Sequence, residues 1–351
     1  MADKIIIIGL IIVGLAGAYI GLGGLSDGGM FAGGPSLFAS TLSTISEDFS
    51  SYTGRFLITF DNFKNVHSGI LDENQEVKIF DIESHFASNR VFVATDRGLF
   101  LSRDGGLTWD GLPMYANEIE SDSLVLQMLP LSSNGNEYLV SVFNNGVGTV
   151  YATHDSFFTL EEIVDFKGEA AYDIFRSGAT LYLAMSNGQL ISYDLNKNTA
   201  RVVNVFSAPI IRIYTPSDGK IYLLLKSGVL MRATSFEGSF SRIRIGGGFL
   251  GFGSLGVLKL SWDEGGTLFA HTARGVFVSK NGSTFVRITN IPAQTDRVDA
   301  VAYHGGTLYV IVDRRMFSSN DGGASWHITD LPNTFRIFNV FFVGPEIILS
   351  M

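Results

Sequence analysis

The 351-residue chain contains no cysteine, which excludes disulfide bonds, thiolate metal sites and cysteine nucleophiles. Proline is scarce, with 8 residues, and charged residues make up only 17% of the chain. Because 34 acidic residues oppose 25 basic ones, the net charge is -9, and a generic nucleic-acid binder, which would carry a basic patch, is not expected. The apolar content of 46% excludes a disordered tail protein.

Glycine, in contrast, is abundant, with 40 residues. Many glycines beside few prolines indicate a protein with many tight turns. The chain is long enough to bury a large core, in one large domain or two ordinary ones.

Residues 5–25 are uncharged and mostly apolar, and as a helix they would span roughly 30 Å, the thickness of a bilayer core. Lys4 precedes this segment, and no Lys or Arg follows before Arg55. We therefore expect a single-pass anchor with a cytoplasmic N-terminus and an extracytoplasmic remainder. A cleaved signal peptide is the alternative, since Ala16-Gly17-Ala18 resembles a cleavage site and would give a secreted protein. Residues 26–53, rich in Gly and Ser, are expected to form a spacer.

A turn motif recurs along the rest of the chain. Residues 102–109 read SRDGGLTW and residues 319–326 read SNDGGASW. Weaker copies begin at Thr59, Thr153, Ser192, Thr234 and Ser279, so that successive copies lie between 39 and 51 residues apart. Short apolar runs bounded by Gly, Asn and Asp precede each copy, as in antiparallel strands joined by hairpins.

Four-stranded units repeated at this period predict an all-β fold, a β-propeller. The seven motifs predict seven four-stranded antiparallel blades over residues 54–351. The closing blade would combine strands from both ends of the chain, after an N-terminal transmembrane helix. A β-sandwich of the same strands is the alternative.

The turn motifs resemble the Asp-box (BNR) repeats of sialidase-like propellers. In length, anchor and repeat number the chain looks most like the photosystem II assembly and stability factor-like proteins. That resemblance implies a role in assembling or stabilising a complex. We expect the motif residues to be structural, because an Asp side chain accepts hydrogen bonds from its own turn and glycine permits positive φ. In the two strongest copies these residues are Ser102, Asp104, Gly106, Trp109, Ser319, Asp321, Gly323 and Trp326.

No catalytic residue is assigned from the sequence. A sialidase-type glycosidase needs an arginine cluster, and the nearest match to its arginine motif, residues 335–338, lacks the proline and follows the last turn motif. Asp81, Asp173 and Asp299 are candidates for the paired carboxylates of glycosidases. The six histidines, at 67, 85, 154, 271, 304 and 327, show no metal-binding spacing, so neither a metal nor a cofactor is expected.

One polar residue in each innermost strand is expected at a similar depth. These residues form a candidate ring in the central channel, with two alternative roles: binding of a partner, or structural pairing within the ring. They are Asp81, Gln127, Asp173, Arg212, Lys259, Asp299 and Asn339. Propeller partners commonly bind across the loops of one face, where such a ring would open.

The sequence therefore favours a membrane-anchored, extracytoplasmic scaffold or assembly factor that binds a protein partner in an envelope complex, and not a nucleic acid. A glycan-binding protein or glycoside hydrolase is the first alternative. The second is a surface or filament subunit whose apolar N-terminal helix packs against copies of itself.

Overall fold

A computed structural model of the chain describes residues 55–59, 67–71, 77–85, 90–112, 123–132, 135–246, 255–293, 297–331, 339–343 and 346–350. The chain divides into two compact units, Met1–Ser40 and Thr41–Met351, and every described residue belongs to the second. The predicted anchor, the whole predicted spacer and residues 335–338 lie outside the described residues.

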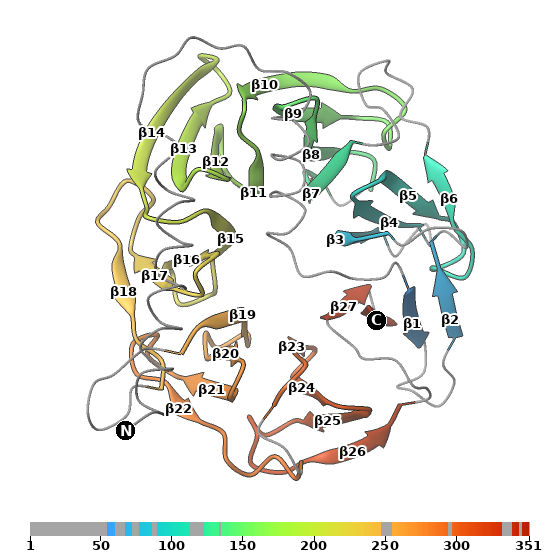
Figure 1. Cartoon of the computed structure of the whole chain (residues 1–351), viewed down its shortest axis with the longest axis vertical. Helices are drawn as coiled ribbons and strands as arrows, with labels where there is room; N and C mark the ends of the chain where they lie inside the picture. The colour runs from blue at the N-terminus through green and yellow to red at the C-terminus, as the bar shows by residue number, and fades with distance from the viewer. Residues whose placement is uncertain are drawn as a thin grey trace, which may run out of the picture. The chain divides into compact units, whose positions relative to one another are not determined.

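Six sheets each consist of four consecutive antiparallel strands. We name each blade by its strands, from the innermost to the outermost (Figure 1). The first three blades are β3–β6 (Ile79–His85, Arg90–Thr95, Gly98–Ser102, Asp110–Leu112), β7–β10 (Leu124–Pro130, Tyr138–Asn144, Val147–Thr153, Glu161–Lys167) and β11–β14 (Ala171–Ser177, Thr180–Met185, Gln189–Asp194, Thr199–Val205). The other three are β15–β18 (Ile210–Tyr214, Ile221–Leu225, Leu230–Ala233, Ser241–Ile243), β19–β22 (Val257–Trp262, Leu268–Thr272, Gly275–Ser279, Val286–Arg287) and β23–β26 (Ala300–His304, Thr307–Val312, Arg315–Ser319, His327–Asp330).

The two ends of the described chain meet in one further sheet. Its strands are β1 (Arg55–Thr59), β2 (His67–Ile70), β27 (Asn339–Val343) and β28 (Glu346–Ser350), in the order β2-β1-β28-β27. Phe56 pairs with Ser350 across the junction, and Leu57 pairs with Leu349. Only the backbone of this composite sheet is described.

The predicted fold class needs correction. The structure describes six blades in full, not the seven expected. The sequence count treated seven turn motifs as equal, whereas the motif at Thr59 continues into residues 60–66, outside the described part, and its strands belong to the composite sheet. The transmembrane helix is also not shown: among the described residues no helix is long and apolar enough to cross a membrane, and residues 5–25 are not among them.

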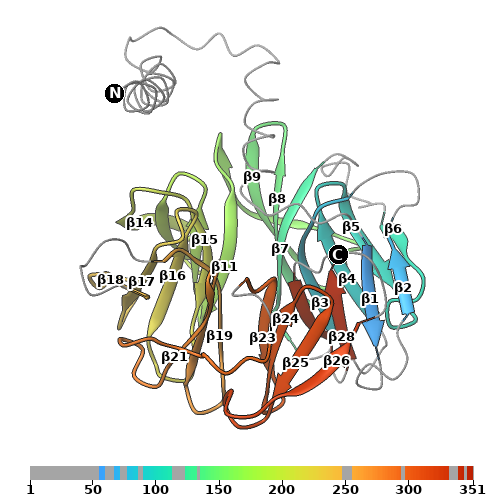
Figure 2. The ribbon, with the colours of Figure 1, turned by 60° about the horizontal axis from the view of Figure 1, so that its bottom comes forward.

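The core of the propeller lies between neighbouring blades. Figure 2 shows the blades standing side by side, so that each sheet presents both faces to its neighbours. Between blades β3–β6 and β7–β10, for example, the rings of Phe92 and Tyr138 pack edge to face with their centroids 5.4 Å apart, and Phe157 packs against both at 5.0 Å. Such aromatic pairs add to the stabilisation from burial of apolar area. The alternating apolar pattern of each strand therefore serves two interfaces at once.

Close approach of the segment that connects β14 to β15 explains one recurrent glycine. Gly188 has φ +83° in the turn before β13, and a Cβ added there would lie 2.6 Å from the Phe206 carbonyl oxygen. Only glycine fits both the backbone conformation and the space.

Candidate functional site

The predicted ring residues follow irregularities in the innermost strands. In β3, Ile79 pairs with Thr95 and Asp81 with the adjacent Ala94, so Phe80 is an extra residue, a β-bulge. The same register shift occurs before Gln127, Asp173, Arg212 and Lys259. We call the extra residues the bulge residues: Phe80, Leu126, Tyr172, Ile211 and Leu258.

Three of the ring residues connect consecutive blades by side chain to backbone hydrogen bonds. The N–H of Met128 donates to Asp81 Oδ2 over 3.0 Å, and the N–H of Ile213 donates to Asp173 Oδ2 over 2.5 Å. Between these contacts, the N–H of Ile174 donates to Gln127 Oε1. In each case the donor is the residue directly after the ring residue of the next blade. We call these three contacts the inter-blade belt.

The inter-blade belt ends where the ring residue is a cation instead of a hydrogen-bond acceptor. Arg212 and Lys259 cannot accept hydrogen bonds. At the next junction the N–H of Leu260 instead donates to the Tyr214 hydroxyl, over 3.4 Å.

Arg212 reaches across the ring. Its Nη2 donates to the carbonyl oxygen of Phe80 over 2.9 Å, although two further blades lie between the blades that carry these residues. Its Nη1 donates to the carbonyl oxygens of Tyr172, at 3.3 Å, and Ile211, at 3.4 Å. All three acceptors are carbonyl groups of bulge residues, so the guanidinium group joins three blades.

Burial raises the pKa of the carboxyl groups around Arg212. The pKa of Asp173 rises to about 7 because the side chain is buried, although Arg212 opposes the shift. Burial likewise raises the pKa of Asp81, again opposed by Arg212, and raises that of Glu83 strongly, with the Asp81 charge adding to the effect. Burial, followed by the Arg212 charge, lowers the pKa of Lys259 to about 8. All four pKa shifts have burial as their main cause, and interactions among the neighbouring charged groups modify them.

The bulge residues form an apolar layer beside these charges. Phe80, Leu126 and Tyr172 are at most 2% exposed and belong to one apolar cluster, against which Ile211 packs. Leu258 is the exception, at 55% exposure. Apolar side chains from four consecutive blades therefore meet near the centre of the ring. Sequence analysis did not identify them, because a bulge residue has the same apolar character as its neighbours in a strand.

The structure thus brings together only part of the predicted ring. Asp81, Asp173, Arg212 and Lys259 influence one another electrostatically, and Gln127 belongs to the belt. Asp299 instead accepts from the N–H of Asp313 at 2.8 Å and lies 3.8 Å from Arg297. Asn339 lies in β27, and its side chain is outside the described part.

The turn motifs form a second, outer group of polar contacts. In residues 102–109, Asp104 Oδ1 accepts from the N–H groups of Leu107 at 3.0 Å and Thr108 at 2.9 Å. The Ser102 hydroxyl donates to the same carboxylate at 2.7 Å and accepts from the N–H of Gly106 at 2.6 Å. Desolvation raises the pKa of Asp104, but these hydrogen bonds and that from the Thr108 hydroxyl together outweigh it and lower the pKa to about 2.

The same geometry recurs in residues 153–160 and 319–326. We call these three segments the aspartate turns. Asp155 and Asp321 each accept a backbone N–H and a hydroxyl four residues later, from Thr159 and Ser325 respectively. Trp109 and Trp326 pack against the adjoining apolar clusters, and Trp109 Nε1 also donates to the carbonyl oxygen of Gly106. In these turns the aspartates bind their own backbone.

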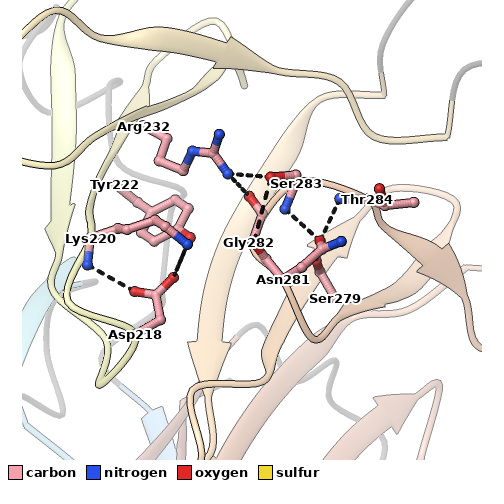
Figure 3. Close-up of polar contacts among 9 residues, drawn as sticks. All are labelled: Asp218, Lys220, Tyr222, Arg232, Ser279, Asn281, Gly282, Ser283 and Thr284. Atoms are coloured by element: carbon pink, nitrogen blue, oxygen red, sulfur yellow. Dashed lines mark hydrogen bonds and ion pairs between the residues drawn. The ribbon is translucent and has the colours of Figure 1, made fainter.

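Residues 279–284 form a shorter variant of this turn that contacts the preceding blade (Figure 3). Asn281 Oδ1 accepts from the N–H groups of Ser283 and Thr284, both at 2.9 Å. Arg232 of blade β15–β18 donates to the carbonyl oxygen of Gly282 at 2.9 Å. Beside it, the Tyr222 hydroxyl donates to Asp218 Oδ2 at 2.7 Å. The outer turns thus also hold neighbouring blades together.

A shallow depression lies between the innermost strands of blades β7–β10 and β11–β14. Its volume is about 440 Å³, and it is lined by Leu129, Pro130, Leu131, Phe175, Arg176 and Gly178. The same two blades have outermost strands of seven residues, β10 and β14, whereas those of the other four fully described blades have two to four. Sequence analysis did not identify this surface, since it depends on the ends of strands from two blades.

Three exposed apolar side chains lie on the same pair of blades. Phe158 is 58% exposed in an aspartate turn, and Val202 and Val205 of β14 are 47% and 69% exposed. Exposed apolar side chains on one part of a surface are typical of interaction surfaces.

The candidate glycosidase carboxylates are engaged in other contacts. Asp81, Asp173 and Asp299 each accept a backbone N–H. Among the described residues, no group of three His, Cys, Asp or Glu side chains is arranged to hold a metal ion.

The strand order and the contacts between innermost strands define the class of the protein, an all-β propeller. No family model matches the chain, and no curated protein matches it. The fold is similar to that of YCF48 from Cyanidioschyzon merolae, with a TM-score of 0.59 at 13% identity, covering 80% of this chain and 97% of that one.

Two further solved structures are similar over comparable lengths. YCF48 bound to D1 peptide has a TM-score of 0.59 at 11% identity, covering 78% of this chain and 93% of that one. U3-55K has a TM-score of 0.56 at 13% identity, covering 80% of this chain and 97% of that one. At these identities the likeness shows the propeller fold alone.

Proposed function

We propose that the chain is a membrane-anchored, extracytoplasmic propeller that binds a protein partner, as a scaffold or as an assembly or stability factor of an envelope complex. The observation that carries the proposal is that blades β7–β10 and β11–β14 carry both the depression and the exposed apolar side chains of Phe158, Val202 and Val205. YCF48, a propeller of similar fold, has been solved with a peptide bound to it. The resemblance of the turn motifs in the sequence to Asp-box repeats also supports the proposal.

The partner surface is tested by comparing three versions of the full-length chain. Wild type, Val202→Lys/Val205→Lys and Val286→Lys are each captured from the membranes of the native host, and the co-purified proteins are quantified. Val286 is the matched control, because it is a valine on an outermost strand with 62% exposure. We expect one protein to be retained by wild type and Val286→Lys and reduced at least tenfold by the double substitution. Equal recovery with all three would contradict this surface.

The anchor is tested separately. Deletion of residues 1–25 is expected to move the propeller from the membrane fraction to the soluble fraction, since the apolar run would no longer insert. A deletion variant that still sediments with membranes would contradict anchoring by this segment. Loss of self-association on the same deletion would instead indicate a filament subunit.

No specific observation on the described residues supports glycoside hydrolysis. The three candidate carboxylates bind backbone N–H groups, so they do not form a pair facing a substrate. Release of reducing sugar from host envelope glycans by the purified chain would reverse this ranking.

A further inference from the structure

We propose that the centre of the ring is a binding site for a planar guanidinium cation, and that Arg212 occupies this site from within the chain. The inference is independent of the proposed partner. It rests on the carbonyl oxygens that accept hydrogen bonds from Arg212.

The acceptors come from backbone positions that a β-bulge makes available. A bulge leaves its extra residue outside the regular ladder of hydrogen bonds. The carbonyl oxygens of Phe80, Tyr172 and Ile211, all bulge residues, accept from Arg212 at 2.9, 3.3 and 3.4 Å. Three blades therefore present carbonyl oxygens to one group.

The charges around the group also suit a cation. Burial raises the pKa of both Asp81 and Asp173, and the Arg212 charge partly opposes this rise. Both carboxylates therefore interact electrostatically with Arg212. The Asp81 charge in turn raises the pKa of Glu83, after the larger effect of burial. Lys259, the other cation, acts on Asp81. With Arg212 removed, Asp173 would lose the cation that acts on it, and Asp81 would retain Lys259.

The geometry favours a guanidinium group over an ammonium group. Guanidinium carries five N–H donors in a planar fork, and here its two terminal nitrogens address acceptors from different strands. An ammonium group is a compact, strongly hydrated charge, and it would have to leave water to contact the same carbonyl oxygens. The acceptor set is therefore selective for the shape of the cation as well as for its charge.

The test is chemical rescue of the full-length Arg212→Ala variant. We expect its thermal midpoint to fall by about 5 °C or more, because the buried acceptors and carboxylates lose their cation. Guanidinium chloride at about 10 mM, far below the molar concentrations at which it denatures proteins, is expected to restore at least half of this loss. Sodium chloride at equal ionic strength and tetramethylammonium chloride are expected to restore none.

Two further proteins serve as controls. Wild type is expected to show no gain, because Arg212 fills the site. Arg232→Ala removes another arginine that donates to a backbone carbonyl oxygen, that of Gly282, and is expected to show no gain specific to guanidinium. Equal shifts in wild type and Arg212→Ala, or equal shifts with sodium and guanidinium, would overturn the proposal.

The proposal stays testable if Arg212→Ala does not fold. The variant is then refolded with and without guanidinium at the same concentration, and soluble folded protein is measured by circular dichroism. Recovery only with guanidinium supports the site, and failure in both conditions contradicts it. Arg212→Lys retains a positive charge without the planar group. Its thermal midpoint is expected to lie below that of Arg212→Ala measured with guanidinium.

Discussion

The centre and the rim of the propeller use the same side chain in opposite ways. Asp173, in the inter-blade belt, is 5% exposed, and burial raises its pKa to about 7. Asp104, in an aspartate turn, lies near solvent, and hydrogen bonds from its own turn lower its pKa to about 2. Both carboxylates accept backbone N–H groups. At the rim, the hydrogen bonds stabilise the charged carboxylate because it keeps its contact with solvent. At the centre, the cost of burying the charge outweighs the same kind of hydrogen bond.

The largest effect is expected from removal of the central carboxylate. Asp173→Leu leaves the N–H of Ile213 without its acceptor at a buried position, whereas Asp173→Asn keeps an acceptor oxygen there. The free energy of unfolding is expected to fall by about 3 kcal/mol, measured by urea titration. Asp165→Leu, at an exposed position of β10, is the control and is expected to change it by less than about 0.5 kcal/mol. Equal effects of the two substitutions would remove the distinction between centre and rim.

A smaller loss is expected at the rim. Asp104→Ala removes the acceptor of two backbone N–H groups and two hydroxyl groups, which water can partly replace. The expected loss is about 1–2 kcal/mol in the same titration. The neighbouring Arg103–Asp110 ion pair, at 2.8 Å and largely exposed, supplies the control. Arg103→Ala is expected to change the free energy of unfolding by less than about 1 kcal/mol.

The two carboxylates are expected to give opposite pH dependence. Asp173 has a raised pKa in the folded state, so its favourable contribution is present below pH 4 and is lost as the pH rises through 7. Asp104 has a lowered pKa, so its contribution is present above pH 4 and is lost as the pH falls through 2.

Asp173→Asn measures this contrast. It should gain stability relative to wild type between pH 4 and 7, with a slope of at most about 1.4 kcal/mol per pH unit in the difference between their free energies of unfolding. Asp104→Asn should lose stability relative to wild type as the pH rises from 2 to 4. Parallel curves for wild type and both variants would contradict the assignment.

The smallest effect is expected in the variant turn of residues 279–284. Asn281→Asp supplies a charged acceptor to the N–H groups of Ser283 and Thr284. A gain of about 0.5 kcal/mol is expected, since a charged acceptor forms stronger hydrogen bonds than an amide. Asn281→Ala, which removes the acceptor, should shift the thermal midpoint in the opposite direction. A loss of stability with both substitutions would show that this turn differs from the aspartate turns.

Local patterns allowed much of the fold to be predicted from the sequence. Alternating apolar residues and turn residues located the strands of six blades, and the Ser-x-Asp spacing of 102–104 and 319–321 indicated turns that accept their own N–H groups. The bulges were missed, because an extra apolar residue such as Leu126 leaves no mark in a strand that is apolar on both faces.

The contacts of Arg212 could not be predicted for a different reason. Its acceptor Phe80 lies 132 residues away, and the repeat aligns the strands of the two residues without indicating that they touch. Similarly, the depression at Leu131 and Phe175 exists only once two blades are placed side by side. Interactions between distant segments depend on the assembled ring, and a single sequence does not specify which residues of a strand meet there.

The inter-blade belt has a consequence for hydrogen exchange. An innermost strand is the edge of its sheet, and edge amides that point away from the sheet normally exchange quickly with solvent. The amides of Met128, Ile174 and Ile213 are instead bound by side chains of the preceding blade. Their exchange requires neighbouring blades to separate, so these three amides report the opening of the ring itself, whereas amides in the middle of a sheet report the unfolding of one blade.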